Sequence, residues 1–164
     1  MKLLAFYDRK DYELSYPRQI YNMVRAIIIL DEKIALIYSP KYKVYLIPGG
    51  KIDIGETHID ALIRETREEA GLVVKPNSVK ELGKVVEIRK GIWEDEIFEQ
   101  HRFYYFCDVE DIILEQDLTE KEREAGYQLE FLPLEQAISF NESKEVNWID
   151  SETSVLKLLH NILC

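Results

Sequence analysis

Three glutamates of one short segment, Glu65, Glu68 and Glu69, stand at spacings of i, i+3 and i+4. On a helix, side chains at these spacings lie close together on one side. Their like charges would destabilise an isolated helix by roughly 0.2–0.5 kcal/mol per pair. A hard dication such as Mg²⁺, which prefers carboxylate oxygens, would relieve that repulsion. The segment therefore favours a divalent-metal site, although an exposed acidic face without a ligand has the same spacing.

The segment around these glutamates has the period and the end signals of a helix. Thr57 and Asp60 have the spacing of a capping box, and Gly71 is placed to end the last turn in a left-handed conformation. We therefore predict a helix from Thr57 to Gly71, with its glutamates on the side away from a buried apolar stripe. The stripe is predicted to comprise Ile59, Leu62, Ile63, Thr66 and Ala70.

Apolar, β-branched segments before this helix predict strands. Residues 21–30 and 33–39 are two such segments, and Asp31-Glu32 between them indicates a tight turn. Residues 2–7 predict an additional edge strand. A shorter apolar segment, 44–47, runs into Pro48-Gly49-Gly50, which ends a strand and allows unusual backbone conformations. The chain is thus expected to turn sharply just before the helix.

The second half of the chain alternates strands with helices. Residues 79–89 and 97–109 predict a long hairpin around 91–95, and residues 117–125 are interpreted as a loop. The remaining predicted elements are a strand at 127–132, a helix from Pro133 through Ala137, and a helix at 151–163. Mixed strands with three helices indicate a layered α/β fold.

Composition and charge exclude several classes of protein. The 164 residues are 46% hydrophobic and 32% charged, which excludes a disordered, collagen-like or membrane-spanning chain. The net charge of −10, with no basic cluster, excludes a nucleic-acid polymer as partner. Cys107 and Cys164 are too few for a disulfide framework and are expected to be free thiols. The apolar start is shorter than a secretory signal, so the protein is expected to be cytoplasmic.

Residues 50–72, read as one string, resemble a known signature. The string runs Gly50-KIDIG-Glu56-THIDALI-Arg64-ETREEA-Gly71-Leu72. It resembles the Nudix box of the Nudix (MutT-type) pyrophosphohydrolase superfamily, and Pro48-Gly49 before it resembles the family as well. Its one departure is Thr66, where the family usually has an aliphatic residue. Because Thr66 lies on the apolar stripe, that departure concerns packing and leaves the acidic positions intact.

The resemblance implies a fold and a role for individual residues. It implies one Nudix domain over residues 1–164, with a mixed β-sheet sandwiched between helices (α/β/α). Arg64 would hold a glutamate through a charge-assisted hydrogen bond, and Glu56 would brace the loop against the helix, with a secondary chance of touching the metal. The Mg²⁺ or Mn²⁺ ligands would be the Gly49 carbonyl, Glu65, Glu68 and Glu69, with Glu69 the most constant.

The resemblance also implies Mg²⁺-dependent hydrolysis of a phosphoanhydride bond. The substrate would be a small nucleoside di- or triphosphate, or a nucleotide linked to another group through diphosphate. One to three dications would activate water and neutralise phosphate charge. A carboxylate base could contribute roughly 10²–10⁴-fold. Glu65 or Glu68 is our first choice for that base, and the candidates outside the box are Glu96, Glu99, Glu122 and Glu124.

The sequence is also consistent with other functions and contacts. A Nudix-like ligand-binding or regulatory module without catalysis is the main alternative, and a prenyl diphosphate isomerase is a third. Arg25 and Arg102 could contact phosphate because strand arginines can face a cleft. The amino-terminal strand could pair with the edge of a second copy to form a homodimer. Aromatic residues that could line a substrate pocket are Trp93, Tyr104 and Phe106.

Overall fold

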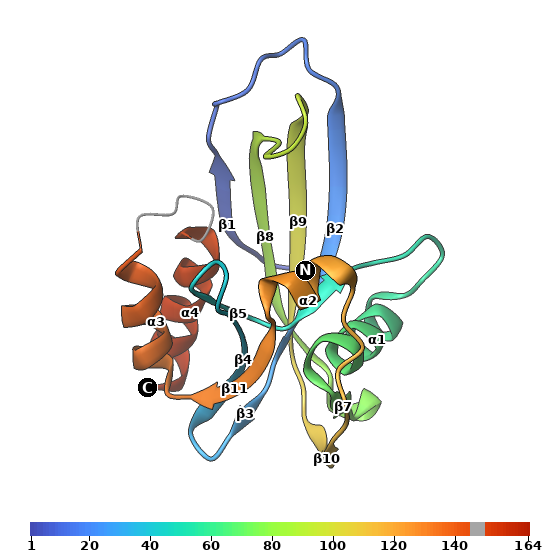
Figure 1. The fold of residues 1–164 in the computed structure, drawn as a ribbon, viewed down its shortest axis with the longest axis vertical. Helices are drawn as coiled ribbons and strands as arrows, with labels where there is room; N and C mark the ends of the chain where they lie inside the picture. The colour runs from blue at the N-terminus through green and yellow to red at the C-terminus, as the bar shows by residue number, and fades with distance from the viewer. Residues whose placement is uncertain (145–149) are drawn as a thin grey trace.

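The computed structural model describes residues 1–144 and 150–164, which form three sheets and four α-helices (Figure 1). The strands of the first half are β1 (Leu3–Asp8), β2 (Arg18–Ile27), β3 (Ile29–Leu30), β4 (Lys33–Ser39), β5 (Val44–Leu46) and β6 (Gly49–Lys51). The strands of the second half are β7 (Leu72–Val74), β8 (Lys80–Lys90), β9 (Ile97–Phe106), β10 (Val109–Ile113) and β11 (Gln128–Leu132). The helices are α1 (His58–Ala70), α2 (Glu120–Ala125), α3 (Leu134–Glu142) and α4 (Asp150–Leu163), and a 3₁₀ turn covers Pro76–Ser78.

The largest sheet has five strands in the order β1-β8-β9-β2-β6. β8 and β9 form the predicted antiparallel hairpin, and β1 is an edge strand that runs parallel to β8. β2 runs parallel to β9 along its whole length, which places Arg25 opposite Tyr104. β6 closes the other edge against β2, with Gly49 opposite Arg25. The strand that precedes the predicted helix is therefore fixed to the largest sheet through β2.

A second sheet contains β11, β4 and β3, and β5 also pairs with β4. The β3–β4 pair turns at Asp31-Glu32, as predicted, and both residues have a positive φ. A third sheet consists of β7 and β10 alone. β7 follows α1 directly, so the end of the helix is anchored to this small sheet.

Helices cover the sheets on two sides, and the fold is the expected mixed α/β sandwich. α1 packs on β6, β7 and β2, whereas α3 and α4 pack on each other on the far side (Figure 1). One core cluster lies under α1 and includes Val24, Leu62 and Ala70, all at most 1% exposed. A second cluster lies under α3 and α4 and includes Leu156 and Leu159. Within the described residues, no helix has the length and apolarity needed to cross a membrane.

Three expectations about local structure were wrong. Residues 117–125 contain helix α2, because Thr119 and Glu122 form a capping box that starts it. Ile59 is 43% exposed, whereas Glu69 is only 6% exposed. The buried arc of α1 is displaced toward Glu69 because β6 and β7 both pack on the helix. One of the three glutamates is therefore not on a free surface.

Candidate functional site

The site begins at the turn from β5 into β6. The amide of Ala26 on β2 donates to the Pro48 carbonyl at 2.8 Å, which fixes the turn to the central sheet. Gly50 then passes directly under α1. A Cβ atom at Gly50 would lie 2.2 Å from Oε2 of Glu65, so the missing side chain provides the space that the Glu65 carboxylate occupies.

α1 carries the glutamates between two well-defined ends. The Thr57 hydroxyl accepts a hydrogen bond from the Asp60 amide at 3.1 Å, which is the N-cap half of the predicted capping box. Gly71 ends the helix with φ of 72°, a left-handed conformation. The Gln116 side chain donates to the Glu69 carbonyl at 2.7 Å, so the segment before α2 runs along the end of α1. The helix therefore holds its acidic side chains on a fixed backbone.

Arg64 is the centre of the acidic cluster. Its Nε and Nη2 donate to the two oxygens of Glu56 at 2.8 and 2.9 Å, and Nη2 also donates to the Lys51 carbonyl. Its Nη1 donates to Glu65 at 2.7 Å and to Glu68 at 3.4 Å. These hydrogen bonds lower the pKa of Glu56 to about 2 and raise the pKa of Arg64. One guanidinium thus braces the loop and holds two of the three helix glutamates.

Glu69 is the buried member of the cluster. Its Oε1 accepts a hydrogen bond of 3.3 Å from the Gly49 amide. Burial raises the pKa of Glu69 to about 8, and the charge of Arg25 offsets only part of that shift. Burial also raises the pKa of Glu65, against the effect of Arg64. Two carboxyl groups of α1, next to the start of β6, therefore have too little positive charge around them to offset their burial.

The three helix glutamates do not converge as a set of ligand atoms. Arg64 pairs with Glu65 and Glu68, while Glu69 is bound to the Gly49 amide. Within the described residues, the group of three carboxylate, imidazole or thiol side chains that does converge lies elsewhere, on α3 and α4. The structure therefore places the predicted residues on one side of the β6–α1 junction, but their ligand atoms do not surround a common point.

A cavity of about 190 Å³ is connected to this cluster through two of its lining residues, Arg25 and Tyr127. Both interact electrostatically with Glu69: Arg25 lowers the pKa of Glu69, and Glu69 adds to the effect of burial that raises the pKa of Tyr127 to about 12. Glu69 does not itself line the cavity. The other polar side chains that line it are Glu87, Arg89, Gln100, Arg102 and Glu152.

Several of these lining residues belong to a buried polar network centred on Glu152 of α4. Glu152 is 2% exposed and accepts hydrogen bonds of 2.9 Å from both Arg102 and the Tyr104 hydroxyl. Its other oxygen accepts from the Ile47 amide at 3.3 Å. Because Ile47 lies two residues before Gly49, α4 is tied directly to the turn that leads into the site.

A second carboxylate, Glu87 on β8, completes the network. Ser151 donates to Glu87 at 2.5 Å, and Arg102 donates to Ser151 at 2.6 Å. Burial acts to lower the pKa of Arg102, but Tyr104, Glu152 and Glu87 act in the opposite direction, so its pKa is raised. Our sequence reasoning missed Glu152 and Glu87. A usable signal exists, because Glu152 stands three residues before Val155 in the apolar stripe of its helix.

The residues named as outside candidates for a base lie in different places. Glu96 and Glu99 pair with Tyr21 and Arg18 on the strands, and Glu124 is exposed. Glu122 caps α2, yet its charge contributes to the raised pKa of both Glu65 and Glu69. Of these four candidates, Glu122 is the one coupled to the helix glutamates.

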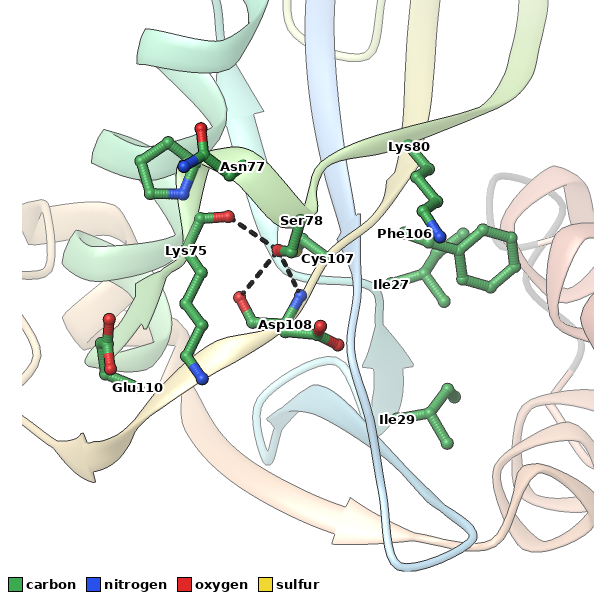
Figure 2. A pocket seen from close by; sticks show the side chains of 11 residues that line it. Ile27, Ile29, Lys75, Asn77, Ser78, Lys80, Phe106, Cys107, Asp108 and Glu110 are labelled. Atoms are coloured by element: carbon green, nitrogen blue, oxygen red, sulfur yellow. Dashed lines mark hydrogen bonds between the residues drawn. The ribbon is translucent and has the colours of Figure 1, made fainter.

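The predicted aromatic residues do not share a pocket. Trp93 is 82% exposed in the β8–β9 turn, and Tyr104 is fully buried. Phe106 lines a separate hollow of about 720 Å³, which contains none of the box glutamates (Figure 2). Figure 2 shows Ser78 bridging Lys75 and Asp108 at that hollow through hydrogen bonds to their backbones.

Comparisons with known proteins agree with this architecture. A probable DHNTP pyrophosphohydrolase of Lactococcus lactis is 27% identical over 90 residues, which is 54% of this chain and 51% of the relative. An ADP-ribose pyrophosphatase of Methanocaldococcus jannaschii is 36% identical over 81 residues, which is 48% of this chain and 47% of the relative. The matched segments thus span about half the length of these relatives.

Solved structures match over more of the chain. A MutT protein from Bacillus halodurans superposes with a TM-score of 0.63 and 20% identity, covering 84% of this chain and 80% of that one. A NUDIX hydrolase from Nitrosomonas europaea gives 0.62 and 16%, covering 87% and 90%. At these identities the likeness establishes the fold. Residues 21–153, most of the chain and the whole of the glutamate cluster, match the NUDIX domain model, and the chain therefore belongs to the NUDIX family.

Proposed function

We propose that this protein hydrolyses a phosphoanhydride bond in a nucleoside di- or triphosphate, or in a nucleotide linked to another group through diphosphate. Family membership supports a reaction of this class, and the names of two relatives, a probable DHNTP pyrophosphohydrolase and an ADP-ribose pyrophosphatase, agree with it. The observation that carries the proposal is the position of Glu69. It is a buried carboxyl group that interacts with Arg25, one of the three arginines that line the cavity.

The residues at the β6–α1 junction fit a hard dication. Glu65, Glu68 and Glu69 would supply carboxylates and Gly49 a backbone carbonyl, and these are the oxygen-only donors that Mg²⁺ and Mn²⁺ prefer. The raised pKa values of Glu65 and Glu69 are a further argument, because a cation would offset the cost of burying their charge. When bound, the dication would polarise the phosphate and make a water molecule acidic.

The side chains around the metal ligands have separate tasks. Arg64 holds Glu56 and Glu65 and so keeps the loop and the helix in register. Glu65 is our choice for the general base that takes the proton of the attacking water. Arg64 holds its carboxylate at 2.7 Å, and the carboxylate lies directly against Gly50 at the β6–α1 junction. Glu68 remains the second choice, since it lies one turn further along the same face.

Arg25 is the residue we propose as the main contact to a substrate phosphate. It lines the cavity and interacts with Glu69, so a phosphate held there would lie beside the metal ligands. Its ion pair with Glu152 is long, 3.7 Å from Nε to Oε1, and in the described part of the chain its buried Nε has no hydrogen-bond partner. Arg102 also lines the cavity, but Glu152 and Glu87 already occupy its guanidinium.

The test is a panel of nucleoside phosphates and nucleotide-linked diphosphates, assayed with Mg²⁺ and with Mn²⁺, with products identified by mass. We expect at least one compound to yield the two products of phosphoanhydride cleavage. Glu69→Gln should then lower kcat by at least ~100-fold, because a lost metal ligand removes several kcal/mol of charge stabilisation in the transition state. Thermal unfolding should show that this variant is folded.

Asp60→Asn is the matched control, because Asp60 is an exposed acidic residue of the same helix. It removes one negative charge from α1 and should leave kcat unchanged. Full activity in Glu69→Gln would disprove the proposed metal site. Tight binding of a panel member without any cleavage would favour a ligand-binding module instead.

A further inference from the structure

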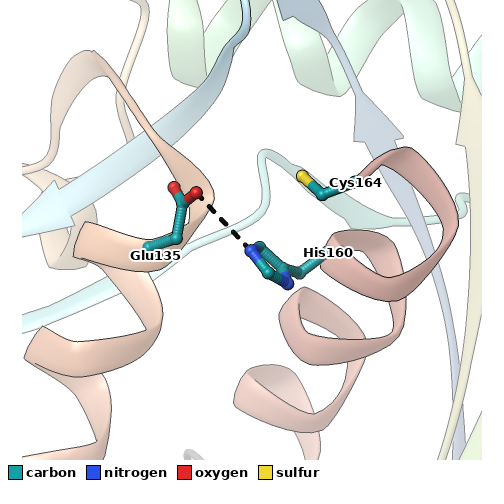
Figure 3. A group of neighbouring side chains, drawn as sticks. All are labelled: Glu135, His160 and Cys164. Carbon is teal, nitrogen blue, oxygen red and sulfur yellow. Dashed lines mark ion pairs between the residues drawn. The ribbon is translucent and has the colours of Figure 1, made fainter.

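A second group of side chains with metal-ligand chemistry lies on the opposite side of the molecule from α1. Glu135 is the second residue of α3, and His160 and Cys164 belong to the last turn of α4 and the residue after it (Figure 3). The amide of Cys164 donates to the His160 carbonyl at 2.9 Å, so helical spacing continues to Cys164. Their side chains therefore share one face of the helix. One ligand atom from each of the three residues lies within 4.8 Å of the others.

The two helices that carry these residues are held together by their own core. Leu134 and Ala137 of α3 and Leu156 and Leu159 of α4 are buried in one apolar cluster. Packing thus fixes the two helices that carry the three residues, whose side chains are partly or fully exposed. Fixed helices lower the ordering cost of binding.

The spacing within the group is close to that of a tetrahedral metal site. His160 Nε2 and Glu135 Oε1 are 3.5 Å apart. In a tetrahedral Zn²⁺ site with Zn–N and Zn–O bonds near 2.0–2.1 Å, the two ligand atoms lie roughly 3.3–3.4 Å apart. The longer Zn–S bond gives a sulfur-to-nitrogen separation of about 3.6 Å. The Cys164 sulfur lies within 4.8 Å of the other two ligand atoms, and its side chain is exposed and therefore able to rotate toward them.

The ligand types select a different ion from the one proposed for α1. A thiolate, an imidazole and a carboxylate suit Zn²⁺, Co²⁺ or Ni²⁺, whereas Mg²⁺ prefers oxygen ligands alone. Asp31 and Glu32 line the same hollow as Glu135 and Cys164, and the cation in that lining is Lys33. The charged residues of this lining are net negative and would attract a cation.

We propose that Glu135, His160 and Cys164 form a second metal site, specific for a dication of the Zn²⁺ type, that joins the start of α3 to the end of α4. The site supplies three protein ligands and leaves a further position for water. Because the folded chain binds the ion and the unfolded chain has no preformed site, the ion stabilises the two-helix layer. This site is independent of the phosphoanhydride chemistry proposed above.

The experiment is a Co²⁺ titration of the reduced, full-length protein in excess Mg²⁺, followed by absorption spectroscopy. A thiolate-to-cobalt charge-transfer band should appear and saturate at one ion per chain, and Zn²⁺ should remove it. Cys164→Ser should abolish the band, and His160→Ala should weaken Co²⁺ binding by at least ~10-fold, the lower end of the loss seen when a metal site is disturbed. Zn²⁺ at ~100 times its Kd should also raise Tm by about 5 °C in the unsubstituted protein.

Glu142→Gln is the matched control. Glu142 is an exposed acidic residue of α3 that pairs with Lys157 of α4, outside the proposed ligand set. This variant should keep both the band and the Tm rise. Absence of the band in the unsubstituted protein would overturn the proposal, and so would its persistence in Cys164→Ser, which would assign the thiolate to the buried Cys107.

Discussion

The glutamate cluster and the Glu152 network are built in opposite ways. The glutamate cluster comes from a single continuous stretch, and Arg64 pairs with residues one, four and eight positions away along the chain. The Glu152 network joins α4 to β9 and β8, across separations of 50 and 64 residues. The glutamate cluster is partly exposed, whereas Arg102 and Glu152 are at most 4% exposed.

This difference predicts that one region contributes mainly to catalysis and the other mainly to stability. Charges in a partly hydrated loop and helix are screened, so their loss costs little stability. Charges in a buried network are not screened, and removing one partner leaves an uncompensated charge inside the protein. We therefore expect substitutions in the Arg64 cluster to affect catalysis first, and substitutions in the Glu152 network to affect folding first.

The largest effect is expected for Glu152→Ala. It removes one of the two carboxylates that pair with Arg102 and leaves Glu87 as the other. It also removes the hydrogen-bond acceptor of the Tyr104 hydroxyl and of the Ile47 amide. We expect the free energy of unfolding to fall by about 3–5 kcal/mol, as for other broken buried pairs. Urea unfolding followed by circular dichroism measures it. A fall below about 1 kcal/mol, the value of an exposed pair, would show that the network is hydrated and that its contrast with the glutamate cluster is false.

The same contrast explains which features of the structure could be predicted from the sequence. The Gly50–Leu72 signature is local, so residue order alone places its glutamates, its caps and its arginine on one helix and loop. The pairing of Arg102 with Glu152 depends on how β9 meets α4, and no local pattern encodes that meeting. The burial of Glu69 was missed for the same reason, because it depends on the packing of both β6 and β7 against α1. Helix α2 was missed although its signal, the Thr119–Glu122 capping box, is local.

Gly50→Ala tests the glutamate cluster without removing any charged group. The new Cβ would lie 2.2 Å from Oε2 of Glu65, and that carboxylate must move, which a flexible side chain does at small energetic cost. We expect kcat to fall by ~10–100-fold, since a displacement of about 1 Å at a catalytic group can cost that much. The free energy of unfolding should change by less than about 1 kcal/mol, in the range of ordinary surface substitutions.

A double variant separates this cause from a general disturbance of the loop. If Gly50→Ala acts by displacing Glu65, then adding it to Glu65→Gln should cause no further loss of kcat, because the two changes remove the same function. Additive losses would instead place the effect in the backbone of the turn, and the position of Gly50 beneath Glu65 would lose its significance.

The smallest effect is expected on the buried face of α1, where the sequence departs from the Nudix signature. Thr66 is fully buried, and among the described residues its hydroxyl is one of the few buried side-chain groups with no hydrogen-bond partner. Thr66→Val replaces that hydroxyl with a methyl group of similar shape, and the two residues have similar helix propensities. We expect the free energy of unfolding to rise by about 1 kcal/mol, the lower end of the cost of an unsatisfied buried polar group, with kcat unchanged.

The identical change at Thr57 should have the opposite sign. The Thr57 hydroxyl caps α1 by accepting from the Asp60 amide, and losing such a cap costs about 0.5–2 kcal/mol. Chemical denaturation of both variants in parallel measures the two signs within one helix. Destabilisation by Thr66→Val would mean that its hydroxyl has a partner in solution. The departure at Thr66 would then contribute to the stability of α1, and the underside of the helix could not be treated as a purely apolar contact surface.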